Sequence, residues 1–191
     1  MNYKGDTVYI EQVLSGNVNA FSNIVDHHKN KAYNLAFRIC GNHEEAEEVA
    51  QDSFMKAYRS LGSFKMKSSF STWLFRIVYN TAISNVRKKK KGTLSLEDFP
   101  ADATDFIGEN PSEEEAEKEY RTALVNFALQ KLNDEERGLI SLFYYEEMST
   151  DEVAAVSGMT ASNVKVRLFR ARQKMLETIE KVEKKKITYH E

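Results

Sequence analysis

The sequence predicts an all-α protein of two small helical domains. Apolar residues recur at three- and four-residue spacing over most of the chain, which is the period of an amphipathic helix. The 191 residues include only two prolines and eight glycines, and 41% are hydrophobic, as expected of a folded helical protein. The periodicity disappears over residues 93–111, which contain both prolines. We therefore expect domains at 1–92 and 112–191, joined by an acidic flexible linker at 93–111.

Composition argues against several classes of protein. Cys40 is the only cysteine, which leaves neither an internal disulfide nor a cysteine-based zinc site. The histidines lack metal-ligand spacing, and no P-loop, G-x-S-x-G motif or glycine-rich dinucleotide turn occurs. We therefore expect no metal, no cofactor and no enzyme activity. A long apolar run is also missing, which predicts no direct insertion in a membrane and a cytoplasmic location.

Charge is distributed unevenly along the chain. The overall net charge is −2, but residues 1–92 carry +6, residues 93–120 carry −9 and residues 121–191 carry +1. An overall sum therefore hides a positive block and a mixed block on either side of an acidic connector. This arrangement is compatible with a nucleic-acid partner.

The first domain is expected to be a module of three or four helices. One helix covers residues 20–39 and ends at Gly41, and the next begins at the N-cap Asn42 with Glu45 three residues later. The inner stripe of this second helix is Ala46, Val49, Ala50, Ser53, Ala57 and Leu61. Its outer face is an acidic strip of Glu44, Glu48, Gln51, Asp52 and Met55. Such a strip suits a basic partner helix, but most acidic helix faces are simply solvated.

Residues 64–91 combine positive charge with aromatic rings. The helix from Phe70 has an apolar face that includes Trp73 and Leu74. The segment before it reads Phe64, Lys65, Met66, Lys67, Ser68 and Ser69. Lysines can neutralise phosphates and rings can stack on exposed bases, at about 1–3 kcal/mol per base, so this stretch suits unpaired nucleic acid. Alternatively, the rings are core residues and the run of lysines after Arg87 is a solvated helix end.

The acidic connector has two interpretations. It can be a disordered tether, or a flexible polyanion that lies in a basic channel otherwise occupied by nucleic acid.

The second domain is expected to contain four helices. Capping boxes begin three of them, at Ser112 with Glu115, Asn133 with Glu136, and Ser149 with Glu152. Along the first, one side is expected to carry Ala116, Tyr120, Ala123, Leu124, Phe127 and Lys131. Gly158 ends the third, and Thr160 caps a fourth that runs to about residue 179.

The last two helices have the outline of a helix-turn-helix: a short helix, a glycine-containing turn and a longer second helix. The inner face of the second helix is Val164, Leu168, Ala171, Met175 and Ile179. Its outer face includes Ser162, Lys165, Val166, Phe169, Arg170 and Gln173. Residues 163–175 include five basic residues and no acidic one, which favours a helix that reads a major groove, although a general basic helix is the alternative.

Three motifs in order give the chain a resemblance to bacterial sigma factors of the sigma-70 family, extracytoplasmic-function (ECF) group. Residues 46–54, AEEVAQDSF, look like the polymerase-binding helix of that family. Residues 70–77, FSTWLFRI, followed by Asn80 and Arg87, look like its promoter-melting segment. Residues 163–172, NVKVRLFRAR, look like its recognition helix.

The resemblance implies an initiation factor that directs core RNA polymerase to promoters. Residues 1–92 would be sigma region 2, and residues 112–191 would be sigma region 4. Partners would be the largest-subunit coiled coil and the flap of the polymerase, promoter DNA, and an anti-sigma protein, as is usual for relatives. Polymerase binding would use Glu48, Gln51, Asp52 and Phe54. Capture of the melted minus-ten strand would use Phe64, Lys67, Ser68, Ser69 and Phe70, supported by Trp73, Arg76, Asn80 and Arg87. Reading of the minus-thirty-five duplex would use Ser162, Lys165, Val166, Phe169 and Arg170.

This chain departs from the family pattern at two positions of the recognition helix. Many relatives have a small polar residue in place of Val166 and an arginine in place of Lys165, so the preferred upstream sequence cannot be carried over. The alternative function is a two-domain regulator whose helix-turn-helix binds an operator without polymerase.

Overall fold

The computed structural model describes residues 4–92 and 112–188, and every regular element in these ranges is helical. The all-α prediction is confirmed. The helices are α1 (Lys4–Leu14), α2 (Phe21–Cys40), α3 (His43–Ser60), α4 (Phe70–Gly92), α5 (Glu113–Gln130), α6 (Asp134–Ile140), α7 (Thr150–Ser157) and α8 (Ala161–Thr188). Short 3₁₀ turns lie at Val18–Ala20 and Leu61–Ser63, and a π turn follows α6 at Ser141–Tyr145. The expected linker at 93–111 lies outside the described residues.

The helix caps that the sequence predicts are present in the structure. The side chain of Asn42 accepts a hydrogen bond from the Glu45 N–H, and the capping boxes at the starts of α5, α6 and α7 are complete. Gly41 and Gly158 adopt φ values of 76° and 74°, the left-handed conformation that glycine adopts without a steric penalty. These caps satisfy backbone groups that would otherwise lack partners.

Three features of the fold differ from the sequence interpretation. Helix α1 was not anticipated. Helix α8 continues to Thr188 rather than ending near residue 179, and Glu and Lys four residues apart, such as Glu177 and Lys181, favour that extension. Helix α5 buries Leu124, Ala128 and Leu129, whereas Ala123 and Phe127 on the expected side are exposed.

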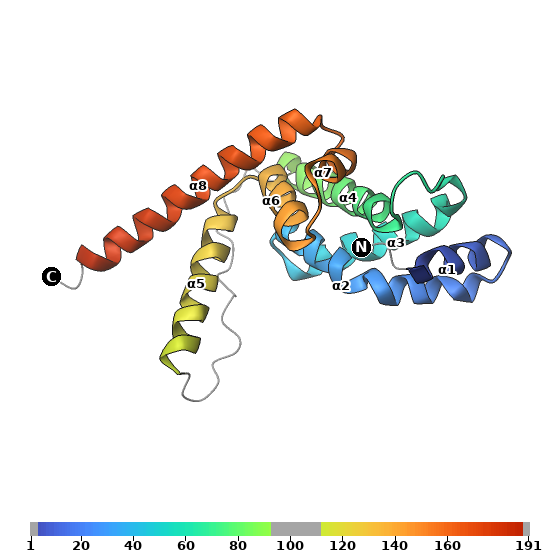
Figure 1. Ribbon diagram of the computed structural model, residues 1–191, viewed down its shortest axis with the longest axis horizontal. Coiled ribbons are helices and arrows are strands. Elements are labelled where there is room, and N and C mark those ends of the chain that lie inside the picture. The colour runs from blue at the N-terminus through green and yellow to red at the C-terminus, as the bar shows by residue number, and fades with distance from the viewer. Residues whose placement is uncertain (1–3, 93–111, 189–191) are drawn as a thin grey trace.

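Helices α2, α3 and α4 pack together as the centre of the N-terminal half (Figure 1). The predicted inner stripe of α3 is buried, as are Leu35 and Ile39 of α2 and Leu74 and Val78 of α4. Helix α1 packs against α2. Burial of large aliphatic side chains, at about 1.5–3 kcal/mol each, is the main force that holds the three helices together.

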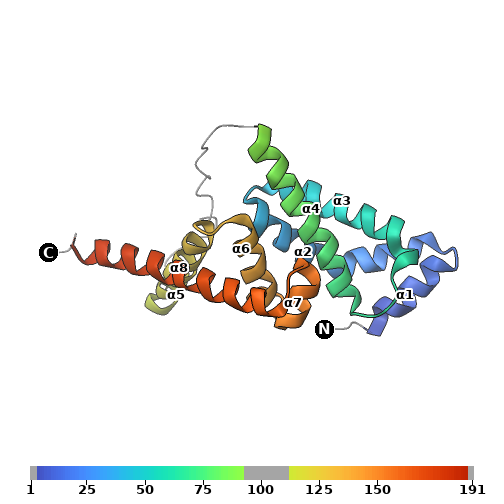
Figure 2. The ribbon, with the colours of Figure 1, turned by 90° about the horizontal axis from the view of Figure 1, so that it is seen from above.

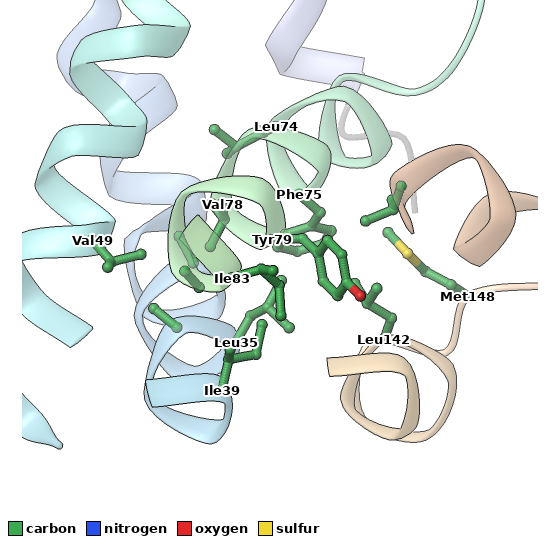
Figure 3. Packing of buried hydrophobic residues seen from close by; sticks show 14 of the residues in the cluster. Leu35, Ile39, Val49, Leu74, Phe75, Val78, Tyr79, Ile83, Leu142 and Met148 are labelled. Atoms are coloured by element: carbon green, nitrogen blue, oxygen red, sulfur yellow. The ribbon is translucent and has the colours of Figure 1, made fainter. Parts of the chain in front are cut away.

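The C-terminal half is not separate from this bundle. Helices α6 and α7 pack against α2 and α4, while α5 and α8 diverge away from it, as seen in both views (Figures 1 and 2). At the junction, Phe75 and Tyr79 of α4 face Leu142 and Met148 from the other half (Figure 3). One cluster of buried residues therefore runs through both halves. No described helix combines the length and apolar character needed to cross a membrane.

Candidate nucleic-acid and polymerase interfaces

Loop 64–69 connects the 3₁₀ turn after α3 to the start of α4. Lys65, Met66, Lys67 and Ser68 are exposed, and Met66 adopts a left-handed conformation with φ of 53°. That conformation costs energy in a residue with a Cβ, so the loop is held in this path by its surroundings. The two lysines and the hydroxyl groups are accessible to a ligand.

An aromatic wall supports this loop from behind. The rings of Phe64, Phe70 and Trp73 lie 5.2 to 5.6 Å apart, centroid to centroid. Phe64 and Trp73 are half-buried, whereas Phe70 is 2% exposed. The centroids of the Phe70 and His28 rings are 5.5 Å apart. Phe70, named above as a base-contacting residue, therefore lies in the core and presents no free face to a base in this conformation.

Beneath the wall lies a buried polar pair that the sequence interpretation missed. His28 Nε2 lies 3.0 Å from Asp6 Oδ2, and both side chains are almost fully buried. Burial lowers the pKa of His28, although the Asp6 carboxylate acts in the opposite direction. The pair connects α1 to α2 directly under Phe70. Asp6 gave no signal in the sequence because its partner is 22 residues away.

The start of α4 is fixed by a hydroxyl cap. Ser69 Oγ accepts a hydrogen bond from the Thr72 N–H at 3.1 Å and lies 2.8 Å from Thr72 Oγ1. The first turn of α4 therefore begins directly after the loop. Arg76 and Asn80 follow on the exposed side of the same helix.

A groove runs between α3 and α4 beside Asn80. Its volume is about 320 Å³, and it is lined by Lys56, Ser60, Ile77, Asn80, Thr81 and Ser84, with no carboxylate among them. Lys56 Nζ donates to Thr81 Oγ1 at 3.1 Å. A neighbouring hollow of about 370 Å³ also involves Lys56 but adds Glu45, Glu48 and Asp52. Sequence reasoning identified only Asn80 in the first groove.

The acidic strip on α3 is exposed, as its spacing predicts. Glu48, Gln51 and Asp52 are accessible, and Met55 is 50% exposed. Phe54, assigned to polymerase binding by resemblance alone, is instead 7% exposed and belongs to the hydrophobic core. The strip can bind a basic partner through its polar residues and Met55, with Phe54 supporting the helix from inside.

The outer side of α8, which we call the recognition face, consists of Ser162, Lys165, Val166, Phe169 and Arg170, all of them exposed. The face is kept in place by the burial of Val164, Leu168 and Ala171 on the inner side. Thr160 Oγ1 accepts a hydrogen bond from the Asn163 N–H at 3.2 Å, which caps the helix after the Gly158 turn. Phe169 and Val166 are 54% and 47% exposed, which leaves apolar groups available for thymine methyl contacts.

Two arginines near these surfaces already have partners. Arg87 Nη2 donates to Glu135 Oε1 at 2.7 Å, and Arg167 Nη1 donates to Glu135 Oε2 at 2.6 Å. Partial burial acts to raise the pKa of the Glu135 carboxyl. The hydrogen bonds from Arg167 and Arg87 outweigh this effect, and the pKa is lowered overall. Of the residues predicted to contact the minus-ten strand, Arg87 is therefore already engaged by α6.

A further apolar groove lies between α5, the π turn and α8. It has a volume of about 400 Å³ and is lined by Val125, Ile140, Tyr144, Tyr145, Arg172, Met175, Leu176 and Ile179. Several of these side chains, including Leu176 at 50% exposed, present apolar area to solvent. The sequence interpretation missed this groove because its sides come from three separate segments.

Among the described residues, no group of three or more His, Cys, Asp or Glu is placed to hold a metal ion. Cys40 is buried, and burial raises the pKa of its thiol to about 12.

Comparison with protein-family models gives two matches. Sigma-70 region 2 matches residues 24–92, and Sigma-70 region 4 matches residues 122–175. The first match covers α2 from residue 24 onward, α3, loop 64–69 and α4, and the second covers the end of α5, α6, α7 and the recognition face.

Curated relatives match over most of the chain. The ECF RNA polymerase sigma factor SigW of Bacillus subtilis is 36% identical over 173 residues, which cover 86% of this chain and 91% of that protein. RNA polymerase sigma-H factor of Pseudomonas aeruginosa is 32% identical, with 88% and 90% covered.

Two solved structures are also similar. CnrH, solved in complex with the cytosolic domain of CnrY, has a TM-score of 0.66 and 26% identity, covering 93% of this chain and 98% of that one. The sigma factor RpoE of Bartonella quintana, solved with the anti-sigma factor NepR, has a TM-score of 0.63 and 25% identity, covering 84% and 96%.

Proposed function

This chain belongs to the ECF group of sigma-70 factors, and from that membership we propose that it binds core RNA polymerase and directs it to promoters by two separate DNA contacts. Loop 64–69 and the outer side of α4 would hold the melted minus-ten strand, and the recognition face of α8 would read the minus-thirty-five duplex. Residues 1–92 and 112–191 would be the corresponding functional domains. The observation that carries the proposal is the presence, in one chain, of two exposed cationic surfaces with different shapes.

The minus-ten contact would need no catalytic group. Lys65 and Lys67 would neutralise phosphates, while Ser68 would offer a hydroxyl group to an extruded base. Binding of that base would offset the few kcal/mol needed to unpair and unstack it. The half-buried rings of Phe64 and Trp73 would form the back of the pocket, with Phe70 as their support. The polymerase would perform the chemistry of RNA synthesis in the cytoplasm.

The groove between α3 and α4 beside Asn80 would continue the same surface. Asn80 and the hydroxyls of Ser60, Thr81 and Ser84 line it, and Lys56 is its cation. No carboxylate lines the groove itself, and Lys56 Nζ also lies 3.9 Å from Asp52 Oδ2 of the neighbouring hollow. Arg76 is exposed on the same side of α4 and would add a second cation.

The minus-thirty-five contact would place the recognition face in a major groove. Arg170 and Lys165 would reach base edges or phosphates, and Val166 and Phe169 would contact thymine methyl groups. The Arg172 guanidinium donates to the Tyr144 hydroxyl at 2.9 Å and would therefore support the helix rather than the DNA.

Polymerase docking would use the acidic strip for the coiled coil of the largest subunit and the apolar groove of α5 and α8 for the flap. Carboxylates at Glu48 and Asp52 complement a basic helix. The similarity to two sigma factors solved with bound partners, one of them named an anti-sigma factor, supports an anti-sigma partner for this chain as well.

The direct test is run-off transcription with core polymerase, followed by mapping of the start sites. We expect promoter-specific transcripts only when the protein is added, and only weak binding of promoter duplex by the protein alone. Tight duplex binding without polymerase, and no transcripts with it, would favour an operator-binding regulator instead.

A charge reversal tests the docking surface. Asp52→Arg should abolish association with core polymerase, because it places a cation opposite a basic partner, while the helical circular dichroism spectrum stays unchanged. Asp26→Arg on α2 is a matched control, because Asp52 and Asp26 are 63% and 66% exposed and each lies near a lysine one turn later. Equal association of both variants, measured by gel filtration with core enzyme, would reject the acidic strip as the docking surface.

A further inference from the structure

The two halves of the chain meet in a packed interface with buried side chains from both. Tyr79 and Phe75 of α4 are buried against Leu142 and Met148, which follow α6 (Figure 3). At the edges, Arg38 lies 3.8 Å over the Tyr145 ring. Apolar and charged contacts therefore hold α6 and α7 against α2 and α4.

Gly138 shows how close the approach is. A Cβ added at this position of α6 would lie 2.6 Å from a ring carbon of Tyr79 and 3.3 Å from the Ile39 side chain. Glycine is unfavourable inside a helix, so its presence in α6 is explained by the close packing of α4. Beside it, the buried Arg137 donates to the Ile39 carbonyl at 2.8 Å.

The first turn of α6 adds ion pairs to α4 across the same interface, and others to α8 within the C-terminal half. We call Asp134, Glu135 and Glu136 the acidic turn. Glu135 bridges Arg87 of α4 and Arg167 of α8, while Asp134 accepts from Lys90 of α4 at 2.6 Å. Glu136 pairs with Lys174 of α8. Each of these cations lies on a helix to which the proposed function gives a DNA contact.

The two proposed DNA sites cannot both be used while α6 remains in this position. Elements about 25 base pairs apart lie roughly 85 Å apart along B-form DNA, at 3.4 Å per base pair. Even α8, with 28 residues, is only about 42 Å long at 1.5 Å per residue, and its half of the chain is packed directly on α4. Binding to both elements therefore requires the halves to separate.

We propose that the acidic turn of α6 is an internal substitute for DNA phosphates, which holds the free protein in a closed form with Arg87 and Lys90 of α4 occupied. This inference rests on the proposed function, because it assigns DNA contacts to α4 and α8. DNA phosphates release the closed form by competing for Arg87 and Lys90. These two pairs are partly exposed, so added salt weakens them as well.

The test is small-angle X-ray scattering of the full chain, without DNA or polymerase. Glu135→Gln removes the bridging charge with little change of size, and Gly138→Ala places a methyl group against Tyr79. Both variants should have a larger radius of gyration than the wild type at low salt, with unchanged helical circular dichroism. Glu117→Gln is the control, because Glu117 pairs with Arg121 inside α5 and the net charge changes equally. Scattering identical to the wild type for both test variants would overturn the closed form.

Binding of an arbitrary 20-base-pair duplex tests the substitution for phosphate. Glu135→Gln should bind several-fold more tightly than Glu117→Gln, because only the first change releases Arg87 of α4 from the acidic turn. Equal binding by the two variants would show that the acidic turn is a structural contact and not a competitor of DNA. Since neither measurement involves polymerase, failure of the proposed function would appear separately, as absence of transcription with the wild-type protein.

Discussion

Loop 64–69 and the recognition face of α8 both place basic residues beside apolar ones, but they rest on different supports. The loop lies on an aromatic wall in which Phe70 is 2% exposed. The recognition face has its own aromatic residue, Phe169, at 54% exposed. In the first surface the rings mainly hold the loop in place, whereas in the second the ring itself is available for contact.

This difference matches the form of DNA that each surface would bind. A single strand needs a shaped pocket to hold an extruded base, and a pocket needs rigid walls from several segments. A major groove accepts an intact helix, so the second surface requires only one exposed helix side and an inner side that anchors it. Each of the following predictions can sharpen this comparison or contradict it.

The largest expected effect concerns the two phenylalanines. Phe70→Ala should lower the free energy of unfolding by about 3–5 kcal/mol, because it removes a buried ring from the core. Phe169→Ala should change it by no more than about 0.5 kcal/mol, because its ring is exposed. Urea unfolding followed by circular dichroism measures both. Equal destabilisation would mean that the two surfaces are supported in the same way.

A smaller effect is expected for base reading by α8. Arg170→Ala should weaken binding of the upstream element by about 1–3 kcal/mol and relax its sequence preference, because a lost base contact affects one position. Competition between mapped promoter variants, with the protein bound to core polymerase, gives both quantities. Arg121→Ala on α5 removes the same charge from an exposed position and serves as the control. A uniform loss across all sequences would indicate a phosphate contact instead.

Much of the fold could be predicted because its signals are local. Caps such as Asn42 and Gly158 act within a few residues, and the burial of Val164 and Leu168 follows from helical periodicity. The exposure of the outer side of α8 could be predicted for the same reason, since one helix side needs no distant partner to define it.

The features that were missed depend on contacts between distant segments. Tyr79 of α4 is buried by α6, whose Gly138 lies 59 positions later in the sequence. Helical periodicity predicts one buried side for α4, and it does not show that α6 buries a second side. Phe70 was interpreted as a base-contacting ring because nothing near it in the sequence shows that His28 and the rest of the wall cover it. The groove at Lys56 likewise forms only when α3 lies beside α4.

The smallest expected effect concerns a single lysine of the loop. Lys67→Ala should reduce the slope of log Kobs against log salt by about 0.7 for a forked promoter with an unpaired minus-ten strand, because one phosphate contact to a single strand is lost. In contrast to Arg170→Ala, the weakening should be the same for every minus-ten sequence. Lys118→Ala on α5 provides the charge control, and Lys67→Arg should retain the slope. A change of base preference with an unaltered slope would assign Lys67 to the base pocket, and the loop would then read sequence by direct contact, as the recognition face of α8 is proposed to do.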